Sequence, residues 1–89
     1  MPSAAQIRAA RALLGLSARE LSKITGVGWA TIQRYEAIDG IPSGQKSKME
    51  LIVAGLERAG IEFIGDPINS PGVRLRRTMD DQPDSRLLC

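Results

Sequence analysis

Histidine is absent from the 89-residue chain, and cysteine occurs once, at position 89. Without histidine, the chain lacks the commonest general base of enzymes and the commonest protein ligand of metal ions. A single cysteine can form neither an intramolecular disulfide nor a thiolate cluster around a metal. The composition therefore argues against an enzyme, and we expect no catalytic residue, no metal site and no cofactor.

Long hydrophobic segments are missing too. No apolar run approaches the roughly 18 to 20 residues that cross a bilayer, and the first residues lack the basic and hydrophobic segments of a secretory signal. Aromatic residues are scarce, with one Trp, one Tyr and one Phe, so the core must be built mainly from Leu, Ile, Val and Ala, which suits helices. We therefore expect a single, mainly helical, cytoplasmic domain with no membrane partner.

The sequence does contain a series of helical patterns separated by glycines. Ser3 can cap a first helix, and a second helix begins at a capping box running from Ser17 to Glu20, in which the two side chains bond each other's backbone N–H. Gly15 and Gly26 end these helices. The expected inward positions recur at helical spacing: Ile7, Ala10, Leu13 and Leu14 in the first helix, and Ala18, Leu21 and either Ile24 or Thr25 in the second.

A third helix is predicted over residues 29–36, with Gly28 as a tolerable N-cap. Ile32 and Tyr35 share its inward face. A fourth helix follows a turn-rich segment at residues 39–44 and ends at Gly60. Its apolar stripe comprises Met49, Ile52, Val53, Leu56 and Ala59, and Gly55 within it is expected to mark close packing.

Beyond Gly60 the apolar period changes from 3.6 to 2, which predicts a β-hairpin over residues 61–77. A lone two-stranded sheet is marginal in water, so its apolar face needs a partner, either the fourth helix or a second subunit. We favour a homodimer formed there. The polar segment 78–89 is predicted to be a disordered tail. The candidate dimer interface consists of Ile61, Phe63, Val73 and Leu75.

The second and third helices, joined through a glycine turn, have the pattern of a helix-turn-helix. Because so few residues join them, these helices must cross steeply: Gly26 makes the turn, and Val27 fills the corner. Leu21 and Ile32 then meet across the crossing. The later helix projects and can enter a DNA major groove about 12 Å wide. The net charge of +2 permits a nucleic-acid partner without establishing one.

A set of residues around this motif carries a resemblance to a known family. It comprises Ile7, Arg8, Arg11, Leu14, Gly15, Leu16, Ser17, Leu21, Gly26, Val27, Thr31, Ile32, Arg34 and Glu36, with segments 56–63 and 71–76 after them. Over residues 4–64 the chain resembles the Cro and phage-repressor type family, also called the xenobiotic-response-element family, in its short single-domain form.

The resemblance implies a lambda-repressor-like fold of about four helices followed by a short C-terminal β-hairpin. Residues 1–64 would form the DNA-binding domain and run into the first strand. The implied function is sequence-specific transcriptional regulation on double-stranded DNA, with repression by a dimer at a palindromic operator as the expected mechanism. The rival hypothesis is a protein-interaction module, such as the antitoxin half of a toxin–antitoxin pair, whose segment 65–89 folds on a partner protein.

The resemblance also implies which residues meet DNA. Arg34 is the sharpest candidate for a base contact, because a guanidinium can bond O6 and N7 of guanine together. Trp29 departs from the polar residue that is usual at its position, and either contacts DNA or packs against the protein. The implied base contacts are Trp29, Ala30, Thr31, Gln33 and Arg34. Phosphate contacts are expected from the second helix, whose N-terminus carries a partial positive charge, through Ser17, Ala18, Arg19 and Lys23.

The resemblance also implies a structural role for one pair of residues. Arg11 and Glu36 match positions that form an ion pair in this family, tying the first helix to the end of the recognition helix. Breaking a buried ion pair leaves an unpaired charge. We therefore expect Glu36→Ala to lower stability more than it changes operator preference.

Overall fold

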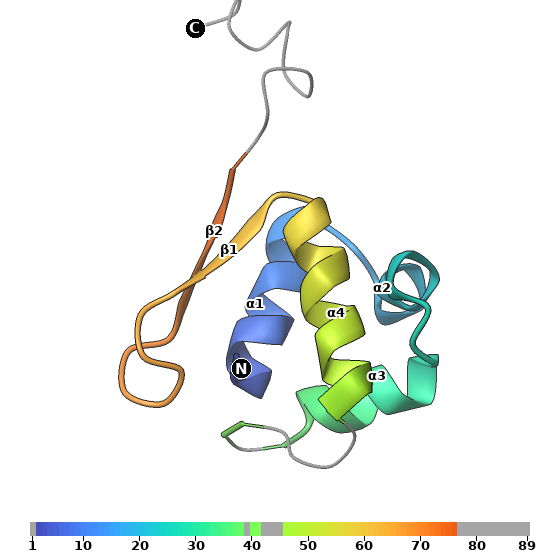
Figure 1. Cartoon of the computed structure of the whole chain (residues 1–89), viewed down its shortest axis with the longest axis horizontal. Helices are drawn as coiled ribbons and strands as arrows, with labels where there is room; N and C mark the ends of the chain where they lie inside the picture. The colour runs from blue at the N-terminus through green and yellow to red at the C-terminus, as the bar shows by residue number, and fades with distance from the viewer. Residues whose placement is uncertain (1, 39, 42–45, 77–89) are drawn as a thin grey trace, which may run out of the picture.

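The computed structural model describes residues 2–38, 40–41 and 46–76. These residues form four helices and a two-stranded antiparallel hairpin (Figure 1), which confirms the mainly helical fold with a C-terminal hairpin. The predicted tail at 78–89 and most of the turn-rich segment 39–44 lie outside the described residues. The elements are α1 (Ala4–Leu14), α2 (Ala18–Thr25), α3 (Trp29–Glu36), α4 (Lys46–Arg58), β1 (Ile61–Ile64) and β2 (Gly72–Leu75).

Helix α1 begins and ends at the predicted residues. Ser3 Oγ accepts a hydrogen bond from the Gln6 N–H, and Gln6 Oε1 accepts one from the Ser3 N–H at 2.9 Å, so the two form a capping box. Gly15 ends the helix in the left-handed conformation, with φ of 72°. The inward position expected for Leu13 is wrong. Its side chain is 48% exposed, because the helix turns by about 100° per residue and Leu14 takes the place against the core.

The hydrophobic core lies where the helices meet. Helix α2 contacts both α3 and α4, while α1 contacts α3, so each helix covers part of at least one other. Tyr35, Met49 and Ile61 belong to the core and are almost completely buried. The largest fully buried side chains are Ile7, Leu21, Val27, Ile32, Ile52 and Leu56.

The contact between α2 and α4 decides which of two neighbouring side chains is buried. Thr25 is buried, whereas Ile24 is 40% exposed. Thr25 Oγ1 donates to the Leu21 carbonyl at 2.8 Å and accepts from the Val27 N–H at 3.2 Å, so the buried hydroxyl is satisfied. Gly55 of α4 packs against this residue: a Cβ at Gly55 would lie 2.7 Å from Thr25 Cγ2. The close packing expected at Gly55 is therefore present.

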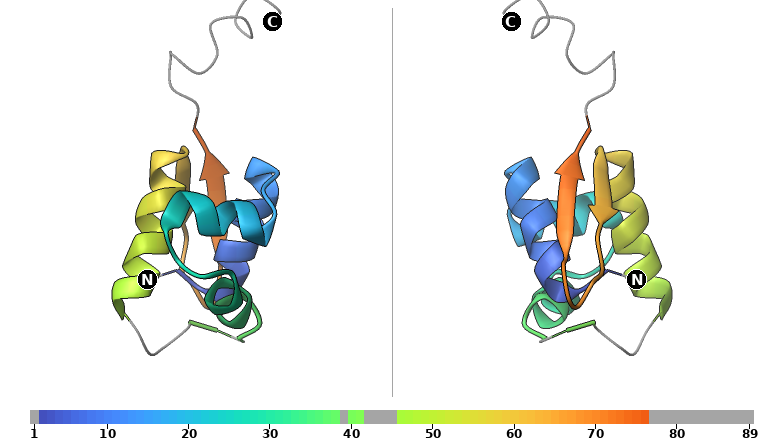
Figure 2. Two further views of the ribbon diagram at one scale, coloured as in Figure 1. Left: turned by 90° about the vertical axis from the view of Figure 1, so that its right-hand side faces the viewer. Right: turned by 90° about the vertical axis from the view of Figure 1, so that its left-hand side faces the viewer.

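The hairpin lies against α1 and α4, on the side of these helices opposite α2 (Figure 2). In its register, Ile61 faces Leu75 and Phe63 faces Val73. Ile61 belongs to the core, and the other three side chains are half-buried against it. The apolar face that was predicted as a dimer interface therefore packs within the chain, against α1 and α4.

Polar contacts bind the hairpin to α1 and lie across its outer face. Gln6 Nε2 donates to the carbonyls of Ile64 and Gly72, at 3.1 and 2.9 Å, and so links α1 to both strands. On the outer face, Glu62 accepts hydrogen bonds from Arg76 and Arg74, which lower the pKa of its carboxyl below the ordinary value. The outer face is thus charged, while the inner face belongs to the core.

Candidate nucleic-acid interface

The turn between α2 and α3 sets α3 at a steep angle to α2 (Figure 2). Gly26 adopts the left-handed conformation, with φ of 77°, and its N–H donates to the Ser22 carbonyl at 2.9 Å. Val27, 1% exposed, fills the corner. Gly28 follows as the N-cap of α3 without a side-chain hydrogen bond. Three residues therefore separate the two helices, as a helix-turn-helix requires.

Helix α3 has one side that faces the core and one side that the rest of the protein leaves open. Ile32, Tyr35 and Glu36 are buried on the core side. Side chains on the open side keep access to solvent and to a partner molecule. The structure gathers there the five residues expected to contact bases: Thr31 is half-buried, and Trp29, Ala30, Gln33 and Arg34 are exposed.

Arg34 keeps most of its hydrogen-bonding capacity. Its Nη2 lies 3.5 Å from Thr31 Oγ1, one helical turn earlier. This distance is at the outer limit of a hydrogen bond, and a guanidinium carries five N–H donors. The arginine therefore retains the two adjacent donors that a bidentate contact with guanine uses.

The N-terminus of α2 is capped by its own side chains. Ser17 Oγ accepts from the Glu20 N–H at 3.0 Å, and Glu20 Oε1 accepts from the Ser17 N–H at 2.8 Å. The bonds from Ser17 lower the pKa of the Glu20 carboxyl below the ordinary value. Ala18 is half-buried and offers only its backbone, whereas Arg19 and Lys23 are exposed. The charged side chains available to a phosphate from α2 are therefore Arg19 and Lys23.

Trp29 contacts α2, the helix that supports α3 and is called the supporting helix below. The guanidinium carbon of Arg19 lies 4.2 Å from the centroid of the Trp29 ring, which is a cation–π contact between α2 and the first residue of α3. The indole remains 37% exposed. Of the two roles left open for Trp29, packing against the protein is present in the structure.

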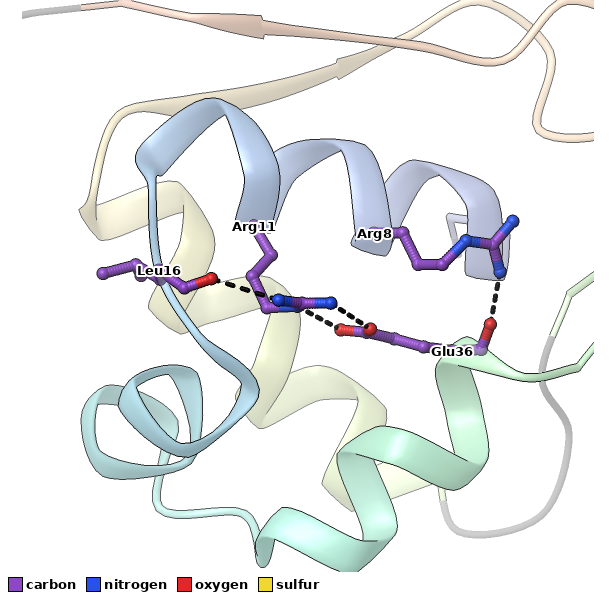
Figure 3. A network of polar contacts seen from close by, with 4 residues as sticks. All are labelled: Arg8, Arg11, Leu16 and Glu36. Carbon is purple, nitrogen blue, oxygen red and sulfur yellow. Dashed lines mark hydrogen bonds and ion pairs between the residues drawn. The ribbon is translucent and has the colours of Figure 1, made fainter.

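Arg11 and Glu36 are brought together where α1 passes the C-terminal end of α3 (Figure 3). Arg11 Nε and Nη2 donate to the two carboxylate oxygens of Glu36, each at 2.9 Å, in a bidentate ion pair. The hydrogen bond to Glu36 raises the pKa of Arg11. The side chain of Glu36 is 8% exposed and that of Arg11 27% exposed, so the pair is largely withdrawn from water.

Two further contacts extend this ion pair into a network (Figure 3). Arg11 Nη1 donates to the Leu16 carbonyl at 3.1 Å, and Arg8 Nη1 donates to the Glu36 carbonyl. We assigned no role to Arg8 from the sequence. Its spacing of three residues from Arg11, which puts both arginines on one face of α1, was the available signal. The last turn of α3 is thus bonded to α1 through both its side chain and its backbone.

Comparison with known families identifies a helix-turn-helix in the same segment. A family model described as helix-turn-helix matches residues 7–48, which include α2, α3, the turn between them and both partners of the Arg11–Glu36 ion pair. Comparison with curated proteins gives no match. In the described part of the chain, no helix has the length and apolar character needed to span a bilayer.

Proposed function

We propose that this chain, which through residues 7–48 belongs to the Cro/C1-type helix-turn-helix family of DNA-binding regulators, is a repressor that reads a palindromic operator as a homodimer. The observation that carries the proposal is the way α3 is held. Its C-terminal turn is bonded to α1 through Glu36, and its opposite side stays open. A recognition helix needs this combination of a fixed position and an unobstructed surface.

Base recognition is assigned to the open side of α3. Arg34 would bond O6 and N7 of a guanine, a bidentate contact that gives roughly 1 to 3 kcal/mol of discrimination against other bases. The shorter side chains of Ala30 and Thr31 suit contact with a thymine methyl group, and Gln33 can pair with adenine. With Trp29, these are the five residues proposed at the major groove.

Contacts with the phosphates are assigned to the start of α2. The first N–H groups of a helix have no intrahelical partner and carry a partial positive charge. Those of Ala18 and Arg19 follow the Ser17 cap directly and suit a phosphate oxygen. Arg19 and Lys23 add two exposed positive charges on the same helix. These contacts would position the protein without selecting a sequence.

A homodimer belongs to the proposal because a single recognition helix reads only a few base pairs. Paired helices about 34–36 Å apart would reach successive major grooves on one face of the duplex. Since α1 and α4 cover the inner face of the hairpin, a second copy would meet the hairpin at its loop end, where Ile64 is 40% and Ile68 57% exposed. Neither residue belongs to α2 or α3, and the hairpin and the turn between α2 and α3 lie on opposite sides of α1 and α4 (Figure 1).

Sedimentation of the free protein tests the dimer. Ile68→Asp should shift the protein towards monomer, because it places a charge in an apolar contact. Leu13→Asp is the matched control, since Leu13 is 48% exposed on α1 and lies outside the proposed contact. A wild-type protein that sediments as a monomer at tens of micromolar would contradict the homodimer.

Selection of bound sequences from a random DNA library, at two salt concentrations, tests the reading of DNA. We expect an inverted repeat from the wild type and one relaxed position from Arg34→Ala. Arg76→Ala removes the same charge from the hairpin, where Glu62 keeps Arg74 as a partner, and should leave the selected sequence unchanged. Transcription from a promoter that carries the selected site should fall when the protein is present.

Two results would count against these assignments. Unchanged selectivity of Arg34→Ala would remove Arg34 from the base contacts. If the selection enriches no sequence and binding is only nonspecific and salt-sensitive, operator reading is overturned. That result would favour the rival hypothesis of a module that needs a partner protein.

A further inference from the structure

Arg19 differs from the other described arginines in what holds its guanidinium. It lies over the ring of Trp29 and, within the described part of the chain, donates no hydrogen bond to a carboxylate, carbonyl or hydroxyl oxygen. The contact with Trp29 therefore fixes the position of the positive charge, and no carboxylate in the described part of the chain pairs with it. Each of the others donates to such an oxygen: Arg8, Arg11, Arg34, Arg58, Arg74 and Arg76.

A guanidinium held over an aromatic ring keeps its donors available. The ring occupies none of the oxygen acceptors that the donors would use, and the five N–H bonds point outward in the plane of the guanidinium. A bidentate contact with a phosphate uses these in-plane donors. The contact with Trp29 therefore restricts the long side chain of Arg19 without competing for the hydrogen bonds that an anion would need.

The position of the pair determines which anion it meets. Arg19 is the second residue of α2 and Trp29 the first residue of α3, so their contact bridges the N-terminal ends of the two helices. Both side chains are exposed on this side. When α3 lies in the major groove, α2 crosses the adjoining backbone, and its N-terminal end comes near a phosphate.

We propose that Trp29 is a positioning residue that holds Arg19 against a phosphate of the operator, and that the arginine, not the indole, makes the DNA contact. The inference rests on the proposed function, because it requires that α3 enters DNA. It reassigns Trp29 from the bases to the support of a backbone contact. Holding the side chain before binding removes part of the entropy loss that a free arginine would suffer.

Binding of the full chain to its selected operator, measured over a series of salt concentrations, tests the proposal with Arg19→Ala, Trp29→Ala and the double variant. Loss of one phosphate contact reduces the slope of log affinity against log salt by about 0.9. Both single variants should flatten the slope and leave the preferred sequence unchanged. The double variant should bind better than the product of the single losses predicts, by about two- to fivefold.

Two controls separate positioning from general damage. Lys23 is an exposed cation one turn further along α2, and its effect should combine with that of Trp29→Ala without coupling. Trp29→Phe keeps an aromatic face under Arg19 and should restore most of the affinity. Because Trp29 is the chain's sole tryptophan, its fluorescence without DNA should change in Arg19→Ala and stay constant in Lys23→Ala.

Each contrary outcome has a distinct meaning. If Trp29→Ala relaxes the preference at a base position, or if its loss of affinity adds fully to that of Arg19→Ala, the indole contacts DNA itself. This inference is then overturned, while the proposed function stands. Unchanged fluorescence in Arg19→Ala overturns it in the same way. A wild-type protein that binds no DNA at any salt concentration would overturn the proposed function and this inference together.

Discussion

Helices α2 and α3 have the same length, eight residues each, yet they are held in different ways. Helix α2 is closed at both ends by its own sequence, through the Ser17–Glu20 capping box and the left-handed Gly26. Helix α3 starts at Gly28 without a side-chain cap and is bonded to α1 at its other end through Glu36. The supporting helix thus depends on local contacts, whereas the recognition helix depends on a tertiary one that leaves its N-terminal end open.

The largest effect should come from the tertiary bond of α3. Glu36→Ala leaves the guanidinium of Arg11 unpaired at a site where it is only 27% exposed. Breaking a buried pair costs on the order of 3 to 5 kcal/mol, and the remaining exposure of Arg11 puts the expected loss near the lower value. The free energy of unfolding in urea measures it.

Glu62→Ala is the matched control for that prediction. It also removes a glutamate bonded to arginine side chains, but on the exposed face of the hairpin, where water and salt screen ion pairs and the loss should be much smaller. Equal losses from the two variants would show that burial of the Arg11–Glu36 pair is not what holds α3. Once folded, Glu36→Ala should keep the operator preference, since Glu36 lies on the core side of α3.

A second effect should appear where α2 meets α4. Gly55→Ala would place a Cβ 2.7 Å from Thr25 Cγ2, and the two hydrogen bonds of the Thr25 hydroxyl resist its rotation. Overpacking costs about 1 to 3 kcal/mol, and the better helix propensity of alanine offsets about 1 of it. We expect a net loss of about 1 kcal/mol or more in thermal or urea unfolding.

Thr25→Ser sharpens this test, because it keeps the hydroxyl and removes the methyl group that the new Cβ would meet. In that background, Gly55→Ala should be neutral or stabilising. A loss that persists there would mean that the backbone of α2, whose Ile24 carbonyl would lie 3.5 Å from the same Cβ, sets the limit.

The same contact shows where prediction from the sequence succeeded and where it could not. The boundaries of α2 were predictable because a capping box and a C-terminal glycine act within a few residues. The choice between Ile24 and Thr25 was not, since both positions fit a helical period near the edge of the core. It depends on Gly55, in a distant part of the chain, and on the Val27 N–H that the threonine hydroxyl accepts.

The candidate site likewise has some features that local sequence sets and others that depend on contacts between distant elements. The open side of α3 follows from its period, so the residues proposed at the bases lie together as expected. The bonds from Gln6 to two carbonyls of the hairpin and the cation–π contact of Arg19 with Trp29 have no local pattern, because they depend on how separate elements meet. Long-range geometry of this kind is visible only in the folded chain.

A smaller effect is expected from the local cap of α2. Ser17→Ala removes the hydroxyl that accepts from the Glu20 N–H, and loss of such a cap costs typically about 1 kcal/mol. Circular dichroism during urea unfolding measures this loss. Glu20→Gln keeps the reciprocal bond without the charge and should change stability less at neutral pH.

The same pair of variants gives a pH test. Because the folded protein lowers the pKa of Glu20, the stability from its charge is present above the ordinary pKa of a glutamate and is lost as pH falls through the lowered value. Glu20→Gln should lack that acid loss. If it loses stability in acid as the wild type does, other carboxylates account for the pH dependence.

The smallest effect should come from supplying α3 with the cap that α2 already has. Gly28 adopts φ of −58° and ψ of 144°, a conformation open to any residue, and a Cβ there would meet nothing within 4 Å. Neither packing nor backbone geometry within the described chain therefore demands glycine. Gly28→Ser adds an oxygen that can accept from the first turn of α3 and reduces the freedom of the unfolded chain, so stability should rise by about 0.5 kcal/mol.

Gly28→Ala, which reduces that freedom without adding a cap, should stabilise less. DNA binding decides what the difference between the helices means. If Gly28→Ser is more stable and binds the operator as well as the wild type, the missing cap is incidental, and α3 relies on Glu36 for its position alone. If it is more stable but binds more weakly, a side chain at this position obstructs the duplex, and the recognition helix has gone uncapped because its first turn must lie close to DNA.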